Sequence, residues 1–241
     1  YINMADNSTA SSGSNASFVN GPMRKTGDDA FVFPVGKGTK WARLGISAPS
    51  NTTDAFTAEY FDAAYSNTSS MATTPSPALN NVSIMEYWDC ARSVGSSAVT
   101  VTLFWENTLS GINNYSSDLV VAHWNGSAWE NKGQTSISGG ITGNVTSTSN
   151  TSFSPFTFGS LSPSFNPLPI TLLNFDGKMN ANNDVELNWR TVSETNNKFF
   201  TVERSSDGVY FTPLVNVEAA GNSNAVEIGR ASCRERVSSP V

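Results

Sequence analysis

The fold is decided by the stretch Asn20-Gly21-Pro22-Met23-Arg24-Lys25-Thr26-Gly27-Asp28-Asp29-Ala30-Phe31-Val32-Phe33-Pro34-Val35-Gly36. It contains two turn signals, Asn20-Gly21-Pro22 and Thr26-Gly27-Asp28-Asp29, because glycine tolerates positive φ and proline holds φ near the value that a turn requires. Apolar side chains then occupy both faces of an extended chain: Ala30, Val32 and Pro34 on one face, and Phe31, Phe33 and Val35 on the other. This pattern is typical of a strand inside a protein. We therefore expect a core strand that is covered on both sides.

Outward from this stretch, the composition favours strands over helices. Only 14% of the residues are charged, and Ser, Thr, Asn and Gly fill most polar positions. Ser, Thr and Asn side chains compete with the helix backbone for hydrogen bonds, whereas Thr, Val and aromatic residues pack well on a pleated surface. We therefore predict an all-β protein built of antiparallel sheets.

The charge and hydropathy patterns argue against two classes of partner. The formal net charge is -6, and no basic cluster could displace counterions from phosphates. No apolar run approaches the roughly 18 residues that span a bilayer. We therefore expect no nucleic-acid binding and no membrane span. The sequence begins at Tyr1 and shows no signal peptide, so we expect it to be a piece of a longer protein.

Strand and turn signals continue along the chain. Residues 55–61 and 98–105 alternate in the period of two that is typical of strands. Residues 66–81, rich in Ser, Thr, Asn and Pro, indicate a long surface loop. Asn125-Gly126 separates two runs that carry Trp124 and Trp129, and an Asn-Gly pair in that position predicts a β-hairpin.

A resemblance to a known family adds to this pattern. The residues that carry it are Phe18-Val19-Asn20-Gly21-Pro22-Met23-Arg24-Lys25, Ala30-Phe31-Val32-Phe33-Pro34-Val35-Gly36, Gly45-Ile46-Ser47 and Phe56-Thr57-Ala58-Glu59-Tyr60-Phe61. Over residues 17–162 the chain resembles a β-rich module of large secreted surface proteins of the Bacteroidetes. The resemblance implies an antiparallel β-sandwich-like domain, type IX secretion, and a location that is extracellular or on the outer-membrane surface.

A second resemblance follows a Pro-punctuated linker at residues 163–167. The residues that carry it are Leu168-Pro169-Ile170-Thr171-Leu172-Leu173-Asn174-Phe175, Val185-Glu186-Leu187-Asn188-Trp189, Ser193-Glu194-Thr195-Asn196-Asn197 and Phe199-Phe200-Thr201-Val202-Glu203-Arg204-Ser205-Ser206-Asp207-Gly208. Over residues 168–226 the chain resembles the first half of a fibronectin type III-like domain of the kind that precedes type IX sorting signals. The pattern agrees, since Val185, Leu187 and Trp189 share one face and Asp207-Gly208 is a turn signal. The resemblance implies a partial fibronectin type III-like sandwich, because the later strands do not follow.

The two ends of the chain differ from the rest. Residues 1–16 are polar and low in complexity, which predicts a linker or the end of an upstream β region. Residues 227–241 carry three arginines within seven residues in a chain otherwise poor in charge, and we expect this tail to be artefactual or non-native. Cys90 and Cys233 lie in unlike contexts, which does not indicate a disulfide framework.

No catalytic or cofactor motif is recognisable. The sequence lacks a Gly-rich phosphate loop, Cys or His pairs at metal spacing and a Gly-x-Ser-x-Gly elbow. His123 is the single histidine, and a catalytic or metal site would need partners for it. Acidic residues lie at turns, where Asp stabilises the backbone: Asp28, Asp29, Asp54, Asp118, Asp176 and Asp184. A calcium site in such loops is an alternative, but no ligand ladder supports it. We predict a chain that is not an enzyme and has no catalytic, cofactor-binding or metal residues.

Three functions remain open. The first is a non-catalytic structural or adhesion segment of a secreted, cell-surface protein. The second is a carbohydrate-binding accessory module, which would need exposed, coplanar rings from Trp41, Trp88, Trp124 and Trp129. For Trp124 and Trp129 the simpler interpretation is aromatic pairing across a hairpin. The third is a fragment attached to an exported hydrolase. The expected partners are surface glycans, other surface proteins, and the type IX machinery through a C-terminal signal outside this sequence.

Overall fold

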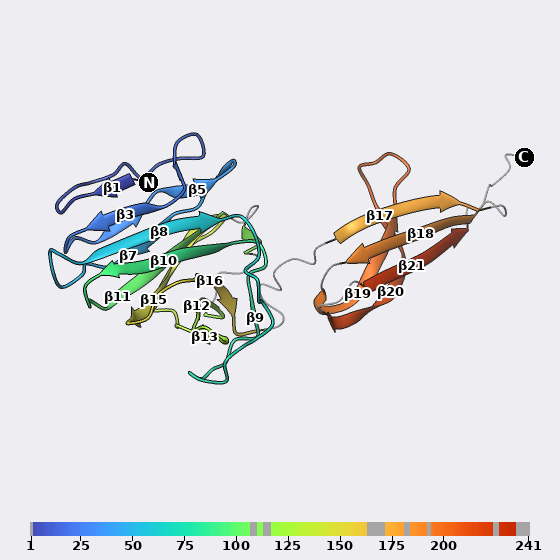
Figure 1. Ribbon diagram of the computed structural model, residues 1–241. Helices are drawn as coiled ribbons and strands as arrows, with labels where there is room; N and C mark the ends of the chain where they lie inside the picture. Colours follow the sequence, from blue (N-terminus) through green and yellow to red (C-terminus); the bar gives the residue numbers. More distant parts are fainter. Residues whose placement is uncertain are drawn as a thin grey trace, which may run out of the picture. The chain divides into compact units, whose positions relative to one another are not determined.

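The computed structural model describes residues 2–106, 110–112, 117–162, 172–180, 184–191, 194–223 and 227–234 (Figure 1). By its internal packing the chain divides into unit 1, Tyr1–Leu168, and unit 2, Pro169–Val241. The elements of the described residues are strands, paired mostly in antiparallel fashion, so the predicted all-β, sandwich-like fold class is confirmed. The expected linker at residues 163–167 lies outside the described residues.

Unit 1 contains sixteen of these strands. They are β1 (Ile2–Met4), β2 (Val19–Asn20), β3 (Met23–Thr26), β4 (Phe31–Phe33), β5 (Val35–Lys37), β6 (Lys40–Trp41), β7 (Leu44–Ile46), β8 (Ala55–Phe61), β9 (Asn81–Val82), β10 (Tyr87–Val94), β11 (Val99–Glu106), β12 (Leu119–Trp124), β13 (Trp129–Asn131), β14 (Ser136–Gly139), β15 (Thr142–Asn150) and β16 (Phe156–Ser160). The predicted strand at residues 55–61 is present with these bounds.

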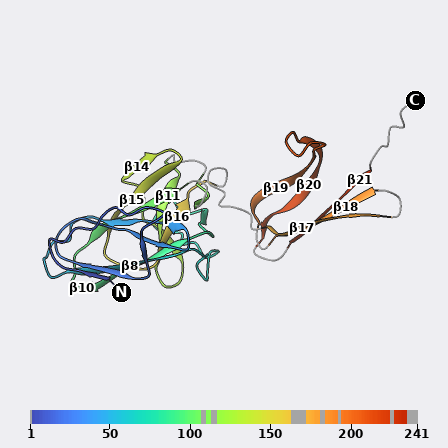
Figure 2. The same cartoon turned by 90° about the horizontal axis from the view of Figure 1, so that it is seen from above.

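Two large sheets enclose the core of unit 1. An eight-stranded sheet has the order β1-β3-β8-β10-β16-β12-β13, with β9 beside β16, and a five-stranded sheet has the order β14-β15-β11-β7-β4. Figure 2 shows β11, β14 and β15 in one layer and β8 and β10 in another. Inward side chains of both sheets meet in one apolar cluster that includes Leu44, Leu103, Phe56, Trp88 and Phe158. This arrangement follows from the period of two along each strand.

The core strand predicted within residues 20–36 is not covered on both sides, so that prediction was wrong. Phe31 and Phe33 are buried, but Val32 is 39% exposed because β4 is an edge strand whose outer face meets solvent. Pro34 has no N–H to donate, and the chain leaves the five-stranded sheet there. It continues as β5, which pairs with β2 and β6 in a separate three-stranded sheet.

The N-terminal residues, for which a linker or the end of an upstream β region was expected, contact unit 1. Strand β1 joins the eight-stranded sheet by pairing in parallel with β3. The Lys25 ammonium, 2% exposed, donates to the Ala5 carbonyl oxygen at 3.1 Å, and the Asn7 N–H donates to Asp29 Oδ2 at 3.0 Å. These contacts link residues that are about twenty positions apart and bind the polar segment to the domain.

A buried aspartate stabilises the turn between β10 and β11. Asp54 Oδ2 accepts a hydrogen bond from the Ser97 N–H at 2.8 Å, and the Arg92 guanidinium donates to the Ser97 carbonyl oxygen at 2.8 Å. Hydrogen bonding to Ser97 is the main cause that lowers the pKa of Asp54, against the effect of burial. Gly95, with φ +91°, packs against this carboxylate, and a Cβ there would lie 1.8 Å from Asp54 Oδ1.

We expect Gly95→Ala to lower the unfolding free energy of unit 1 by about 3 kcal/mol, because it adds strain at positive φ and displaces a buried, hydrogen-bonded carboxylate. Urea denaturation of the full chain measures the loss. Gly126→Ala is the matched control, since Gly126 has φ +100° but no atom within 4 Å of an added Cβ. Equal losses in the two variants would show that strain alone acts and that the Asp54 contact contributes nothing.

Unit 2 contains a three-stranded and a two-stranded sheet. Its strands are β17 (Leu172–Met179), β18 (Asp184–Thr191), β19 (Glu194–Arg204), β20 (Thr212–Ser223) and β21 (Glu227–Arg234), with the orders β17-β18-β21 and β19-β20. Among its described side chains only Trp189, Thr191 and Val202 are buried. Large apolar side chains are more than half exposed on these strands and the β19–β20 loop: Leu173, Phe175, Met179, Val209, Tyr210, Phe211 and Ile228.

Part of the tail at residues 227–241 forms a strand of unit 2. Strand β21 pairs with β18 over eight residue pairs, with Gly229 opposite Trp189 and Ala231 opposite Leu187. A Cβ at Gly229 would lie 2.0 Å from Trp189 Cε2, so the tail fits here because a glycine meets the large ring. Residues 235–241 lie outside the described residues.

Cys90 is a free, fully buried thiol, and burial raises its pKa to about 12, which keeps it protonated and unreactive.

In the described part of the chain, no helix is long and apolar enough to span a bilayer.

Candidate functional site

The four tryptophans of the carbohydrate-binding hypothesis do not form a common platform. Trp88 and Trp129 are fully buried, and the Trp88 indole N–H donates to the Ala42 carbonyl oxygen at 2.9 Å inside the core. Trp41 and Trp124 are partly exposed. The Arg43 guanidinium lies 4.1 Å from the centre of the Trp41 ring and covers one of its faces. Rings that stack on sugars need an open face, which two of these four residues lack altogether.

The predicted hairpin places Trp124 and Trp129 opposite each other. Strands β12 and β13 pair with Trp124 in register with Trp129, as the Asn125-Gly126 signal indicated. Their rings meet at 62° with centres 5.6 Å apart, so they pack edge to face rather than in one plane. The pair therefore stabilises the hairpin, which is the simpler of the two interpretations.

The loop at residues 66–81 packs over this hairpin. The Trp129 indole N–H donates to the Asn67 carbonyl oxygen at 2.7 Å, and Met71 forms a parallel bridge with Trp129. Leu79 and the partly buried Tyr65 and Met71 join Trp129 in a second apolar cluster on the outer face of the eight-stranded sheet. The sequence indicated a surface loop but not that it covers a tryptophan.

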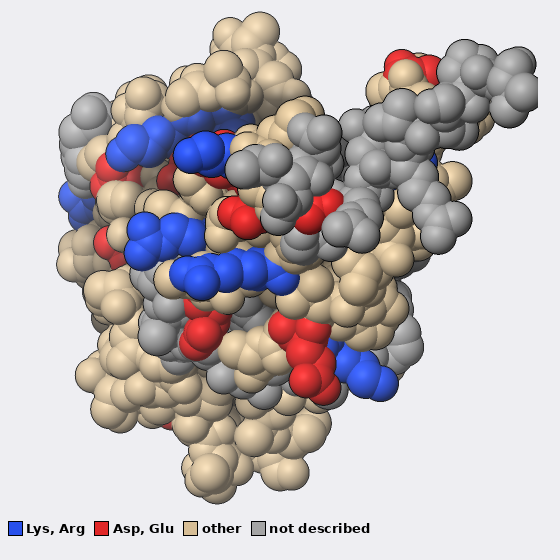
Figure 3. All heavy atoms as spheres, turned by 90° about the vertical axis from the view of Figure 1, so that its right-hand side faces the viewer, with Lys and Arg blue, Asp and Glu red and all other residues tan. Residues whose placement is uncertain are grey.

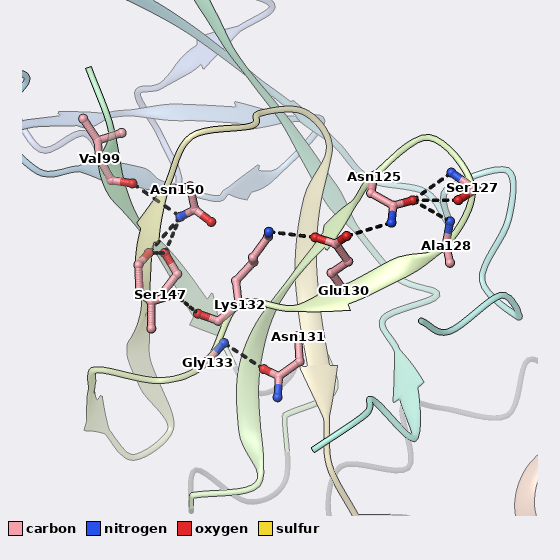
Figure 4. A network of polar contacts seen from close by, with 11 residues as sticks. Val99, Asn125, Ser127, Ala128, Glu130, Asn131, Lys132, Gly133, Ser147 and Asn150 are labelled. Carbon is pink, nitrogen blue, oxygen red and sulfur yellow. Dashed lines mark hydrogen bonds and ion pairs between the residues drawn. The ribbon is translucent and has the colours of Figure 1, made fainter. Parts of the chain in front are cut away.

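Polar contacts hold the hairpin and its neighbours together, as Figure 4 shows. The Asn125 side-chain oxygen accepts hydrogen bonds from Ser127 and Ala128 in the turn, and the Asn125 amide donates to Glu130 Oε1 at 2.7 Å. The other oxygen of Glu130 pairs with the Lys132 ammonium at 2.7 Å. Each charged group of the hairpin thus has a structural partner, and none of these contacts forms a reaction centre.

A further aromatic group was not predicted from the sequence. Phe61 and Tyr87 lie opposite each other on β8 and β10, and their rings stack at 4.6 Å with an angle of 2°. The Lys37 ammonium lies 5.5 Å from the centre of the Phe61 ring, and Tyr65 meets Tyr87 edge to face. Protein groups therefore already contact the rings of Phe61 and Tyr87. Only knowledge of the strand register could have identified it.

His123 is buried in a way that does not suit catalysis. It is 1% exposed, its ring lies 4.8 Å from that of Phe156, and neither ring nitrogen makes a hydrogen bond of good geometry among the described residues. Burial is the main cause that lowers its pKa to about 4. A general base needs a reachable lone pair and an orienting partner. The histidine therefore packs as a neutral side chain.

Glu86 is a second buried titratable group, and sequence reasoning missed it. It is 1% exposed, and the Tyr60 hydroxyl donates to its Oε2 atom at 2.7 Å. Burial raises the pKa of Glu86 to about 7, against hydrogen bonds from Ser110 and Tyr60 and the charge of Lys40. No local signal marks a buried glutamate, since its burial depends on strands distant in sequence.

An acidic cluster near the N-terminus is the one candidate for a metal ion among the described residues. Carboxylate oxygens of Asp6, Asp28 and Asp29 lie within 4.8 Å of one another. The Lys25 ammonium already takes the role of the cation there, because it donates to Asp29 Oδ2 at 3.0 Å and to the carbonyl oxygens of Ala5 and Thr26. The hydrogen bond from Lys25 to Asp29 is the largest cause that lowers the pKa of Asp29. Two of the three aspartates come from a turn that the sequence identified.

We expect Lys25→Met to lower the unfolding free energy by about 2 kcal/mol, because two carbonyl groups lose their hydrogen-bond donor. Millimolar Ca²⁺ should restore part of this loss in the variant and leave the wild-type protein unchanged. Thermal unfolding with and without Ca²⁺ measures both effects, and Lys37→Met, an exposed lysine, is the control. Stabilisation of the wild-type protein by Ca²⁺ would show that the cluster binds metal with Lys25 present.

Figure 3 shows several Lys and Arg groups near one another on the face that it draws, with Asp and Glu groups beside them. A groove of about 430 Å³ runs between residues 7–12 and Asp29–Val32, next to the outer edge of β4. Its one charged lining residue, Asp29, is paired with Lys25. Neither feature provides a nucleophile or an acid–base pair.

Comparison with known proteins gives no relative: no family model, no curated protein and no solved structure matches this chain.

Proposed function

We propose that this chain is a non-catalytic structural or adhesion segment of a secreted, cell-surface protein. The observation that carries the proposal is that the side chains most suited to catalysis or sugar binding are buried or make structural contacts. His123, Glu86, Trp88 and Trp129 are buried, and the described aspartates with lowered pKa values hold turns or Lys25. The resemblance to Bacteroidetes surface modules supports export by type IX secretion. The separate resemblance of residues 168–226 supports a partial fibronectin type III-like identity for unit 2.

Activity measurements test the non-catalytic part. The purified chain, and a version that ends at residue 224, should release no product from polysaccharide, ester or peptide substrates beyond a heat-denatured sample. The physical reason is that no nucleophile, base and orienting group meet among the described residues. Turnover that one point substitution within the chain abolishes would overturn the proposal.

The location requires a separate test in cells. The full-length protein, carrying an epitope tag beside residue 162, should be accessible to antibody and to added protease on intact cells of a Bacteroidetes host. A strain that lacks type IX secretion is the control, and it should retain the tagged protein inside. Equal accessibility in both strains would contradict export by this route.

The carbohydrate-binding alternative depends on Trp41 and Trp124, the two partly exposed tryptophans of the four. Affinity electrophoresis in gels that contain soluble polysaccharides should show no retardation of the wild-type chain. Retardation that Trp41→Ala or Trp124→Ala removes, with the fold retained, would support a glycan site instead. Trp105→Phe, a conservative change at a buried ring, is the matched control.

A further inference from the structure

Glu86 and His123 are buried titratable side chains of unit 1 whose polar atoms are not all hydrogen bonded to described residues. Glu86 and His123 are each 1% exposed. Within the described part of the chain, Glu86 Oε1 and both ring nitrogens of His123 make no hydrogen bond of good geometry. An ion that is buried without such partners is strongly disfavoured. Both groups therefore belong in the folded protein in their uncharged forms.

The surroundings of Glu86 favour the carboxylic acid. Tyr60 on β8 donates to Oε2, and Ser110 also contacts the carboxyl group. The charged groups that act on it are Lys40, which lowers its pKa, and Asp62, which raises it. Burial outweighs these influences and raises the pKa from 4.5 to about 7. In the unfolded chain the same group ionises near 4.5.

The surroundings of His123 favour the neutral imidazole. Phe156 on β16 packs against the ring, and the charge of Lys132, beside β13, disfavours a second proton. The Phe153 backbone and Glu130 act in the opposite direction. Burial dominates and lowers the pKa from 6.5 to about 4.

We propose that folding of unit 1 neutralises Glu86 and His123 together, so that their two titrations compensate and the pair leaves the stability almost unchanged between about pH 4.5 and pH 6.5. Between the two unfolded values, 4.5 and 6.5, the unfolded chain carries a carboxylate and an imidazolium, whereas the folded chain carries a carboxylic acid and an imidazole. Each state holds one proton on the pair. Folding therefore takes up no net proton, and the pair contributes no pH slope.

The contributions of the two groups to stability change in opposite directions with pH. Glu86 has a raised pKa, so its contribution to stability is complete below 4.5 and is lost as the pH rises towards about 7. His123 has a depressed pKa, so its contribution is complete above 6.5 and is lost as the pH falls towards about 4. Over the shared window one contribution falls as the other rises, which leaves a change below about twofold in the unfolding equilibrium constant.

Single substitutions should separate the two slopes. In Glu86→Gln the unfolding equilibrium constant should increase about 40-fold as the pH falls from 6.5 to 4.5, because only His123 still titrates. In His123→Gln it should increase about 40-fold as the pH rises over the same interval. The double variant should lose both slopes and serve as the baseline for all other titrating groups. Amide exchange in β8 and β12 of the full chain reports unit 1 alone.

Each variant is compared with itself across pH, so a loss of stability that is the same at every pH does not affect the result. If His123→Gln does not fold, His123→Leu replaces it. Calorimetry in buffers of different ionisation enthalpy should detect no net proton exchange from the pair on unfolding near pH 5.5. A wild-type slope as steep as that of either single variant, or two single variants with the same sign, would overturn the proposal.

Discussion

Trp129→Ala should lower the unfolding free energy of unit 1 by about 3–5 kcal/mol, the usual loss for truncating a large buried aromatic residue. Trp129 is fully buried, and its ring contacts those of Tyr65 and Trp124. Its indole N–H also satisfies the Asn67 carbonyl group, and its backbone is bridged to the loop at Met71. The substitution therefore removes a core side chain and the contact that holds the loop at residues 66–81.

Urea denaturation of the full chain measures this loss, and amide exchange at residues 67–72 reports release of the loop. Trp124→Ala is the matched control, because Trp124 sits opposite in the same hairpin but is partly exposed. It should cost about 1–2 kcal/mol, since less apolar area is removed from contact. Similar small losses in both variants would show that the loop does not depend on Trp129.

This pair of variants also separates the two interpretations of the tryptophans. If the tryptophans stabilise the hairpin, each variant lowers the unfolding free energy according to how deeply its ring is buried, and neither variant changes sugar binding. If they formed a sugar platform, the partly exposed ring of Trp124 would matter most for binding and least for folding. The structure supports the first expectation through the 62° angle between the rings, which leaves no shared plane.

Local patterns in the sequence predicted local structure well. Asn125-Gly126 identified the β12–β13 hairpin and therefore its register, because the turn fixes which residues stand opposite each other. The alternation at residues 55–61 identified β8. The composition is poor in charge and rich in Ser, Thr and Asn. It predicted the all-β fold class, because these residues disfavour helices along the whole chain.

Features that depend on distant strands could not be predicted in this way. Val32 looks the same in sequence whether β4 is central or at an edge, and the structure places β4 at an edge. Glu86 has no neighbour in sequence that explains its burial, which comes from Tyr60, 26 residues away, and from Ser110. Asp6 meets Asp28 and Asp29 only because β1 pairs with β3. Tertiary packing decides each of these cases.

Unit 2 should have little stability of its own, although its strands are long. Trp189 and Val202 are its buried apolar side chains among the described residues, and a groove of about 180 Å³ lies beside them, lined also by Phe175 and Phe200. Burying so little apolar area does not offset the conformational entropy of ordering five strands. Unpaired strand edges add a tendency to associate.

In the full chain, backbone amides of β18 and β19 should therefore exchange at least about 100-fold faster than those of β8, because exchange follows the local opening free energy. Hydrogen exchange read by mass spectrometry gives both regions in one sample. Strand β8 in unit 1 is the internal control, since Ala55, Phe56, Ala58 and Tyr60 on it are buried. The comparison needs no assumption about how either unit would behave alone.

The expected weakness also predicts how unit 2 responds to change at its tail. Gly229→Val places a branched side chain where a single Cβ would already lie 2.0 Å from Trp189, so it should separate β21 from β18 and expose the indole to acrylamide quenching. Replacing residues 227–241 by a sequence that supplies further strands should instead raise protection across residues 185–202, because Phe175 and Met179 would then be covered. Strong protection across residues 185–202 in an isolated, monomeric fragment 169–241 would contradict this account. It would mean that five strands and a short tail form a complete domain, and that the exposed apolar residues need no partner layer.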